Sequence, residues 1–399
     1  MKTILKASLP TISLLLLLGY IVFNRQSQSY VRIVSEISPT PTLVITTPTP
    51  TPTPIFLSPT LPLKPAFMPT LFVAPEGSDN NDGKSIQSPL QTIQKAVDLA
   101  NPGDVIKLLP GAYLQDVVTK RDGLPNQPIV ITGSRQAVVQ GEKNARIFEI
   151  NHSFITLDGF TIDGHYKAEE TKSAYRDKLI YVIGKAPKQG PSNVKILNME
   201  IKNAGGECIR FRYFSQYNEV AYNQITRCGV IDFEFDGSGK NGEAIYIGTA
   251  PEQRNDGKNP TKDVDASHNN WIHHNTINTQ GNECVDIKEG SSLNLVEYNS
   301  CTGQKDSESG GLDARGENNV FRYNTIYDNL GVGVRLGGDK KFDGTNNTVY
   351  ENTINNNKSG GIKFQRIPQG TVCGNKMEGN EKGDSVGSYG EDFNPEIPC

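Results

Sequence analysis

The sequence lacks an excess of charge of either sign, metal-binding cysteine spacings and extended helical patterning. Its 40 Lys and Arg residues against 44 Asp and Glu residues give a formal net charge of −4. Nucleic-acid-binding domains usually carry a basic stripe, so this balance excludes a nucleic-acid partner. No CxxC or Cys/His spacing is present among the six cysteines and five histidines, and no zinc site is therefore expected.

The N-terminus carries an export segment. Lys2 and Lys6 precede an apolar run from Leu9 to Phe23, and no small-x-small cleavage site follows it. The run is short for a membrane span, which takes about 20 residues, although flanking residues could extend it. We expect residues 1–30 to be an uncleaved signal-anchor, slightly ahead of a cleaved signal peptide. Both alternatives give an extracytoplasmic protein that meets a membrane only through this segment.

Residues 31–70 are predicted to form a spacer. They contain SPTPTLVITTPTPTPTP, in which Pro recurs at every second position over much of the run. Pro fixes φ and removes a backbone donor, so the segment is expected to be extended and semi-rigid. Such a spacer holds a domain away from a membrane or wall.

A repeated phrase dominates the chain from residue 193. Two Asn lie five residues apart, with apolar or β-branched residues between them, in NVKILN (193–198), NEVAYN (218–223), NWIHHN (270–275), NLVEYN (294–299), NVFRYN (319–324) and NTVYEN (347–352). Successive starts lie 24–28 residues apart, except for one gap of 52 that holds two coils or one coil with an insertion around 249–268. Short strands at such a period indicate a solenoid. Leucine-rich repeats share this period, but their Leu-rich pattern and helical return are absent, so they are excluded.

The repeat predicts an all-β fold, a single-stranded parallel β-helix (solenoid) over residues 71–375. Asn at a fixed turn position tolerates left-handed backbone and can hydrogen-bond along stacked turns. The segment 88–104 has apolar residues at helical spacing and would form a short helix that caps the open N-terminal end. VIKLLPGAY (105–113) would be the first strand. Residues 376–399 would form a C-terminal tail or cap, fastened by a disulfide between Cys373 and Cys399.

Aligning the second strand of each coil predicts a charged face. The segments are ECIRFR (207–212), EAIYIG (243–248), ECVDIK (283–288), GGLDAR (310–315), VGVRLG (332–337) and GGIKFQ (360–365). Strand side chains alternate, so the apolar pair in each points inward and the residues between and after it point to solvent. One outward column is Arg210, Tyr246, Asp286, Asp313, Arg335 and Lys363. The second is Arg212, Gly248, Lys288, Arg315, Gly337 and Gln365.

The stacking brings like charges together. Asp286 would lie beside Asp313, and Lys288 beside Arg315, about one strand spacing of 4.8 Å apart. Like charges repel unless something binds between them, so we hypothesise that Ca²⁺ is held by the metal ligands Asp286 and Asp313 with Glu283 or Glu243. Arg315 would lower the pKa of Lys288 and make it a better base.

Two interpretations in which these charges have only a structural role remain open. Diagonal pairing of Asp286 with Arg315 and of Asp313 with Lys288 would satisfy them structurally. Glu207, Glu243 and Glu283 occupy one equivalent position before the strand, where they would cap turns as readily as bind metal.

A base such as Lys288, a cation such as Arg315 and a bound metal ion are the groups that β-elimination on a uronic acid requires. A base removes the proton at C5 once the neighbouring carboxylate is neutralised by a metal or Arg. Lys288 is assigned as the base and Arg315 to the substrate carboxylate or the leaving oxygen. Arg210, Tyr246, Arg335 and Lys363 would bind an anionic chain.

Residues 71 to about 375 resemble proteins of the pectate-lyase-like superfamily, through LFVAPEGSDNNDGKSIQSPLQTIQKAVDLANPGDVIKLLPGAY and the repeat that follows. This resemblance implies a right-handed parallel β-helix. KEGSSLNLVEYNSCTGQKDSESGGLDARGENNVFRYN is similar in part to alginate lyases and chondroitinase B-like lyases. That resemblance implies a catalytic Lys and Arg on adjacent coils, at Lys288 and Arg315, near calcium-binding acids. The acids before Lys288 are spaced differently, and R-G-E stands in place of R-H-G.

The predicted function is therefore an extracellular, monomeric polysaccharide lyase with an acidic polysaccharide as partner and Ca²⁺ as cofactor. One alternative is a non-catalytic module that binds wall or capsule polysaccharide through the same face. Another is a glycoside hydrolase using Asp286 and Asp313 as acid and base. A hydrolase of the polygalacturonase type is disfavoured, because its N-T-D and G-H-G motifs are absent.

Overall fold

The computed structural model describes residues 67–237, 239–338 and 340–399. The predicted export segment at 1–30 and most of the predicted spacer at 31–70 lie outside these residues. Among the helices that the structure describes, none is long and apolar enough to cross a bilayer.

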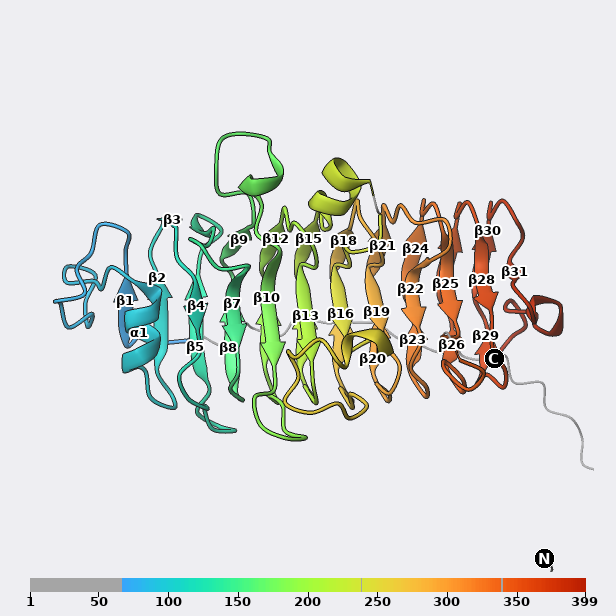
Figure 1. The fold of residues 1–399 in the computed structure, drawn as a ribbon, viewed down its shortest axis with the longest axis horizontal. Coiled ribbons are helices and arrows are strands. Elements are labelled where there is room, and N and C mark those ends of the chain that lie inside the picture. The colour runs from blue at the N-terminus through green and yellow to red at the C-terminus, as the bar shows by residue number, and fades with distance from the viewer. Residues whose placement is uncertain (1–66, 238, 339) are drawn as a thin grey trace, which may run out of the picture. The chain divides into compact units, whose positions relative to one another are not determined.

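Three parallel sheets make up the described chain (Figure 1). Sheet A contains β1 Leu71–Val73, β2 Val105–Leu108, β5 Ile129–Gly133, β8 Ile155–Asp158, β11 Lys195–Leu197, β14 Glu219–Ala221, β17 Trp271–His273, β20 Leu295–Glu297, β23 Val320–Arg322, β26 Thr348–Tyr350 and β29 Val372–Cys373. Sheet B contains β3 Gly111–Tyr113, β6 Ala137–Val139, β9 Thr161–Asp163, β12 Glu200–Lys202, β15 Gln224–Thr226, β18 Thr276–Asn278, β21 Ser300–Thr302, β24 Thr325–Tyr327, β27 Thr353–Asn355 and β30 Lys376–Glu378. Sheet C contains β4 Val117–Val118, β7 Arg146–Ile150, β10 Lys178–Ile183, β13 Ile209–Arg212, β16 Ile245–Ile247, β19 Val285–Ile287, β22 Gly310–Ala314, β25 Val332–Leu336, β28 Gly360–Phe364 and β31 Ser385–Val386.

From β2 onward the chain visits sheets A, B and C in turn, and each strand pairs with its counterpart one coil away. This is a parallel β-helix, as the repeat predicted. The inward pairs are buried, for example Val285 with Ile287 and Leu312 with Ala314. They belong to one continuous apolar core that runs through the coils.

A short helix covers the N-terminal end, as predicted. Helix α1 spans Ile93–Leu99, and Thr92 caps it by accepting a hydrogen bond from the backbone of Lys95. Its buried residues include Ile93 and Val97, which join the core of the solenoid. The prediction of one first strand over 105–113 is wrong, because that segment divides into β2 and β3 and β1 precedes it.

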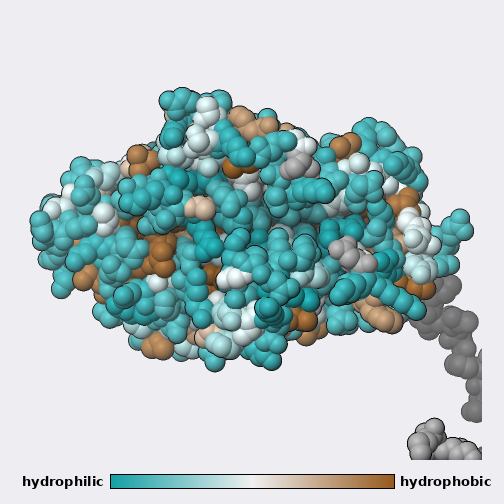
Figure 2. All heavy atoms as spheres, viewed as in Figure 1, coloured by the Kyte–Doolittle hydropathy of each residue, from teal (hydrophilic) through white to brown (hydrophobic). Residues whose placement is uncertain are grey.

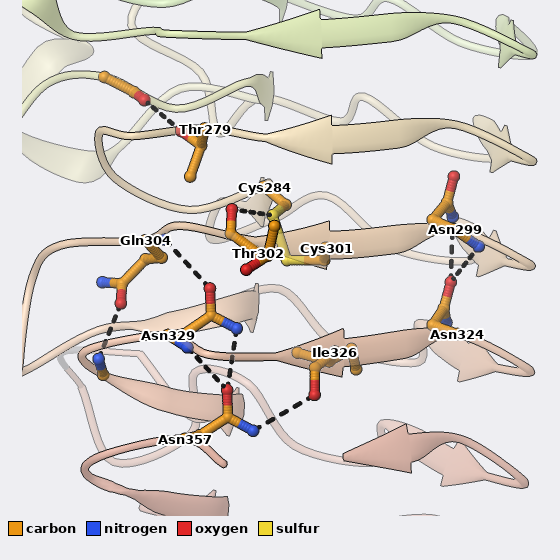
Figure 3. The surroundings of a disulfide bond; sticks show 12 residues. Thr279, Cys284, Asn299, Cys301, Thr302, Gln304, Asn324, Ile326, Asn329 and Asn357 are labelled. Carbon is orange, nitrogen blue, oxygen red and sulfur yellow. Dashed lines mark hydrogen bonds between the residues drawn. A yellow bond between two sulfur atoms is a disulfide. The ribbon is translucent and has the colours of Figure 1, made fainter. Parts of the chain in front are cut away.

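Buried asparagines form ladders along the coils (Figure 3). The backbone N–H and Nδ2 of Asn299 both donate to Oδ1 of Asn324, at 3.0 Å each. The ladder confirms the hydrogen-bonding role predicted for the repeated Asn. Left-handed backbone is found at Asn193 and Asn198 of the first copy of the phrase, as predicted for the repeated Asn. In later coils it lies one residue before the ladder Asn, at Tyr298 and Tyr323, so there the Asn contributes through its amide.

Three disulfides join the six cysteines as Cys208–Cys228, Cys284–Cys301 and Cys373–Cys399. The bond predicted between Cys373 and Cys399 is confirmed. It closes a C-terminal segment that adds β30, β31 and the 3₁₀ helix η4 (Gly390–Asp392) to the solenoid.

The 52-residue gap in the repeat is one coil, because β14 pairs directly with β17. Two insertions lengthen this coil, one before β16 and one after it. The first, residues 227–244, contains the π-helix η2 (Ile231–Asp236), and the second, residues 248–270, contains the 3₁₀ helix η3 (Pro251–Gln253). In Figure 1 they lie at opposite ends of β16, and a third loop holding η1 (Lys172–Ala174) projects near the first insertion.

Candidate active site

The predicted outward column on sheet C is present in full. Successive strands pair Arg210 with Tyr246, Tyr246 with Asp286, Asp286 with Asp313, Asp313 with Arg335, and Arg335 with Lys363. The second column follows the same register, since the backbone N–H of Arg315 donates to the carbonyl of Ile287 at 2.8 Å. Lys288 and Arg315 therefore lie on adjacent coils, side by side.

The prediction that this face is open to solvent is wrong. Asp286 and Asp313 are fully buried, and Lys288 is only 7% exposed. Residues of both insertions close over the strands from their two ends, among them Asn241 and Gln253. The result is a recessed polar site in place of a flat charged surface, although the molecular face around it is mostly hydrophilic (Figure 2).

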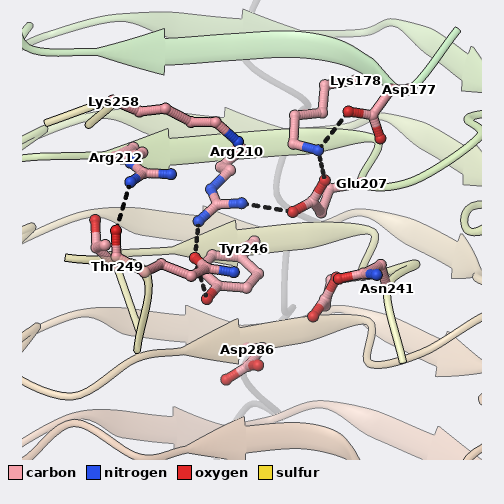
Figure 4. Close-up of polar contacts among 12 residues, drawn as sticks. Asp177, Lys178, Glu207, Arg210, Arg212, Asn241, Tyr246, Thr249, Lys258 and Asp286 are labelled. Carbon is pink, nitrogen blue, oxygen red and sulfur yellow. Dashed lines mark hydrogen bonds and ion pairs between the residues drawn. The ribbon is translucent and has the colours of Figure 1, made fainter. Parts of the chain in front are cut away.

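Tyr246 lies at the centre of the site between two cations. The Arg210 guanidinium is 4.1 Å from the centre of its ring, and the Lys288 ammonium is 4.6 Å from it. The Tyr246 hydroxyl lies 3.3 Å from Oε1 of Gln253, an oxygen that also accepts from Arg210 (Figure 4). Burial raises the pKa of Tyr246, so the phenol keeps its proton across the physiological range.

Lys288 is ion-paired with Asp286 on its own strand. Burial lowers the pKa of Lys288, but the combined interactions with Asp286, Tyr246 and Glu243 outweigh it, and the net pKa lies above the usual value. The prediction that Arg315 would lower this pKa is therefore wrong in its net effect: Arg315 does act in that direction, and Asp286 acts more strongly against it. In this arrangement Lys288 holds its proton at neutral pH.

A cluster of three buried carboxylates lies beside Lys288. One oxygen each from Glu243, Glu283 and Asp286 falls within 4.8 Å of the others. Burial and the neighbouring acids raise the pKa of Glu243 to about 7 and that of Glu283 well above its usual range. One oxygen of Glu283 accepts from Ser309, while Oε2 of Glu283 and Oδ1 of Asp286 have no hydrogen-bond partner among the described residues. Such orphaned buried oxygens fit a cation that is shared between them.

Asp313 lies outside this cluster. Its Oδ2 accepts from Nη1 of Arg335 at 2.9 Å and from Ser309 at 3.3 Å. Asp286 pairs with Lys288 and Asp313 with Arg335, in place of the diagonal pair Asp313–Lys288. Because both aspartates are buried and paired with cations, this geometry also disfavours the hydrolase alternative.

A cavity of about 480 Å³ brings half of the predicted site residues together. Of the predicted residues, Glu243, Tyr246, Glu283, Lys288 and Arg315 line it. Arg210 lines an adjoining cavity of about 270 Å³. Arg335 and Lys363 lie one and two strands beyond Asp313, where Lys363 is 3.7 Å from Glu308.

Comparisons with known proteins agree with this architecture. A family model described as "Right handed beta helix region" matches residues 255–364, and one described as "Protein of unknown function (DUF1565)" matches residues 75–120. No curated protein sequence matches the chain.

Several solved structures share the fold. An alginate lyase from Paenibacillus sp. str. FPU-7 has 18% identity and a TM-score of 0.55, over 73% of this chain and 96% of that one. The pectate lyase Pel9A has 14% identity and a TM-score of 0.52, over 77% and 73% of the two chains. The PL6 family alginate lyase AlyGC has 17% identity and a TM-score of 0.51, over 71% and 37%. The chain has the pectate-lyase-like fold. It is a right-handed parallel β-helix with a capping helix, as predicted.

Within this β-helix, sequence reasoning missed the site residues that the insertions contribute. Asn241 precedes β16 and Gln253 follows it, and both line the two cavities described above. Neither belongs to the repeat, so the strand alignment could not place them. The one available signal was the 52-residue gap, which marks the coil where extra chain must leave the sheet and return.

Proposed function

We propose that the protein is an extracytoplasmic polysaccharide lyase that cleaves a uronic-acid-containing polymer by β-elimination. One observation carries the proposal: Lys288 and Arg315 line a single cavity together with acids of a buried carboxylate cluster. The fold shared with alginate and pectate lyases supports it.

The chemistry follows from what elimination needs. Abstraction of the C5 proton leaves negative charge on the neighbouring carboxylate, so that carboxylate must be neutralised before the proton can leave. Arg315 supplies a fixed cation beside Lys288, and its guanidinium can bind a carboxylate through two parallel hydrogen bonds. Lys288, on the adjacent coil, is the proposed base.

Lys288 can act as a base only when its ion pair with Asp286 is weakened, because this pair stabilises the protonated lysine. The orphaned oxygens of the carboxylate cluster suit a hard cation such as Ca²⁺, which Glu243, Glu283 and Asp286 would hold. When bound, such an ion supplies positive charge that offsets Asp286 and helps to neutralise a uronate carboxylate.

Tyr246 is proposed to return a proton to the leaving O4. Its hydroxyl is protonated at neutral pH and lines the same cavity as Lys288. Gln253 holds the hydroxyl, and Arg210 stacks on the ring, so the donor is oriented before substrate arrives. The predicted substrate-binding role of Tyr246 is thereby extended to proton transfer.

A second candidate is a non-catalytic module that binds polysaccharide at the same site. The Lys288–Asp286 ion pair favours it, since a lysine held in its protonated form is a docking group and no base. The two candidates differ in what they require at position 288. A binding module tolerates Lys288→Arg, whereas a lyase loses turnover.

The test is formation of the unsaturated uronide, followed by its ultraviolet absorbance. The purified full chain is incubated with alginate, pectate and glycosaminoglycans, with Ca²⁺ or with chelator. Lys288→Ala and Lys288→Arg should both abolish the signal. Lys185→Ala, which removes an exposed lysine paired with Glu149 near β10, should leave it intact. A flat trace on every polymer, with binding retained in both Lys288→Arg and the parent chain, would favour the binding module.

A further inference from the structure

Sheet A presents an apolar strip to solvent, on a different sheet of the solenoid from the candidate active site. Strand pairing places Trp271 of β17 beside Leu295 of β20, and Leu295 beside Val320 of β23. All three side chains point outward and are partly or largely exposed. Single apolar residues are common on protein surfaces, but three in register on adjacent coils form a contiguous patch, which is typical of a binding surface. We call these three residues the Trp271 strip.

The Trp271 indole is fixed in orientation by two contacts. One face packs on the imidazole of His273, with ring centroids 3.8 Å apart and planes inclined by 26°. Its Nε1–H donates to Oε1 of Glu297 at 2.8 Å, and Oε2 of Glu297 accepts from Nε of Arg322 at 2.6 Å. Because His273 covers one face, the 40% of Trp271 that is exposed belongs to the opposite face and the ring edges. The indole therefore offers an aromatic platform that is oriented before a ligand arrives, which lowers the entropic cost of binding.

A row of stacked rings borders the strip where the sheet A strands end. The residue after the strand is aromatic in four successive coils, namely Tyr222, His274, Tyr298 and Tyr323. Their ring centroids are 4.9, 5.0 and 4.9 Å apart in that order. Stacking covers the ring faces within the row, so the exposed parts are mainly ring edges and hydroxyl groups. The row therefore supplies hydrogen-bonding groups along one edge of the strip, and Trp271 supplies the open aromatic face.

The charged groups of this face are paired with one another. The Lys195 ammonium is 2.7 Å from Glu219, and Glu219 is 3.3 Å from His273. The Arg322 guanidinium is 2.6 Å from Glu297. An anionic chain would have to compete with these carboxylates for their cations. Electrostatic complementarity therefore favours a ligand without charge.

We propose that the Trp271 strip binds an uncharged polysaccharide of β-linked sugars with the configuration of glucose. In such a sugar every ring substituent is equatorial, so each face of the ring consists of axial C–H groups. These hydrogens carry a small positive charge and are attracted to the negative face of an aromatic ring. The equatorial hydroxyls point outward from the sugar, where the hydroxyls of Tyr298 and Tyr323 can bond to them. The proposal goes beyond the lyase function, because this second polysaccharide site does not depend on Lys288 or Arg315.

The fluorescence of Trp271 reports on this site directly, because Trp271 is the only tryptophan in the sequence. The full chain is titrated with cellohexaose, a soluble oligomer of β-linked glucose, while the indole emission is recorded. We expect a saturable change in the emission. Hexagalacturonate should leave the emission unchanged, even where it occupies the sheet C cleft, because its carboxylates meet only paired charges on this face.

Substitution of the platform gives a second readout, by isothermal titration calorimetry with cellohexaose. Trp271→Ala should weaken binding by at least about tenfold, because it removes the stacking face. Phe342→Ala is the matched control: it removes an aromatic side chain that is 76% exposed on the loop after β25, and it should bind like the parent chain.

An unchanged emission during the cellohexaose titration, or equal affinities of Trp271→Ala and the parent chain, would overturn the proposed site. A dimer that sedimentation velocity detects in the parent chain but not in Trp271→Ala would also overturn it and would assign the strip to self-association. Formation of the unsaturated uronide should be the same in Trp271→Ala and the parent chain. The lyase proposal and the Trp271 site can therefore fail independently of each other.

Discussion

Arg335 donates from Nη1 to Oδ2 of Asp313 at 2.9 Å, and this ion pair joins Asp313 to the strand on the side opposite Asp286, its other neighbour across paired strands. Asp286, the neighbour of Asp313, joins the Glu243–Glu283 cluster instead. Each aspartate has one oxygen paired with a cation and an Oδ1 without a hydrogen-bond partner among the described residues, but only Asp286 lies within ligand distance of two further carboxylates, so we expect Asp286 to be the cation ligand.

The membership of the carboxylate cluster predicts that substitutions at Glu283 and at Asp313 differ in their effect on cation binding. Glu283→Gln removes one of three carboxylates from the cluster and should weaken Ca²⁺ binding by at least about tenfold. Asp313→Asn should leave Ca²⁺ affinity close to that of the parent chain. Isothermal titration calorimetry at one fixed pH measures both affinities. An equal loss in the two variants would mean that Asp313 is a ligand after all, as the sequence alone suggested.

The same Asp313→Asn change should instead cost stability. It leaves the buried Arg335 guanidinium with Gln365 but without its counter-ion, and losing one partner of a buried pair costs about 3 kcal/mol. Lys363→Ala, one strand further along, should cost about 0.5 kcal/mol or less, because Lys363 is 3.7 Å from a highly exposed Glu308. Urea denaturation gives the two free energies of unfolding.

Proton donation by Tyr246 predicts a loss of turnover without a loss of binding. Tyr246→Phe keeps the ring between Arg210 and Lys288 but removes the hydroxyl. We expect kcat to fall by about 10²-fold or more with little change in KM. Tyr181→Phe is the control: Tyr181 pairs with Arg210 on the other side, and its buried ring is covered by Arg146 at 3.9 Å. Equal activity of Tyr246→Phe and the parent chain would assign the donor elsewhere.

The columns of sheet C could be predicted from sequence because two simple periods determine them. Side chains alternate along a strand, and the Asn phrase returns once per coil, so the position of Asp286 beside Asp313 follows from counting. What each aspartate pairs with does not follow. Asp286 faces Lys288 and Asp313 faces Arg335, and that choice depends on rotamers and on burial.

Burial itself was unpredictable because it comes from chain outside the repeat. Residues 227–244 and 248–270 have no counterpart in the other coils, so nothing in the alignment indicated that they cover β16. As a result Lys288, which strand alternation alone predicts to be exposed, is buried. The expected lowering of the Lys288 pKa failed because Asp286, Tyr246 and Glu243 surround the ammonium group, and their combined effect exceeds that of burial and of Arg315.

The asparagine ladder predicts a large cost for losing a single amide. Oδ1 of Asn299 accepts from the backbone N–H and Nδ2 of Asn275, and its own Nδ2 donates to the carbonyl of Ile272. Asn299→Ala leaves these buried groups unpaired, which should cost about 2–4 kcal/mol in the free energy of unfolding. Thr276→Ala, at an exposed position of the neighbouring strand, should stay within about 0.5 kcal/mol. Similar losses in the two variants would contradict a specific role for the ladder.

The lowered pKa of Glu219 predicts how the free energy of unfolding falls at low pH. A hydrogen bond from His273, together with Lys195 at 2.7 Å, lowers the pKa of Glu219 from 4.5 to about 2. A carboxylate whose pKa is lower in the folded state stabilises the fold above its unfolded pKa, and this contribution is lost as the pH falls from about 4.5 to about 2. At 1.36 kcal/mol per pKa unit, the contribution at pH 7 is about 3 kcal/mol. Urea denaturation at pH 7 and at pH 3 should therefore show a smaller loss of stability in Glu219→Gln than in the parent chain.

Glu378→Gln, at an exposed position of β30, is the control and should lose as much stability between pH 7 and pH 3 as the parent chain does. A parent-like loss in Glu219→Gln would show that the ionised Glu219 contributes nothing to folding.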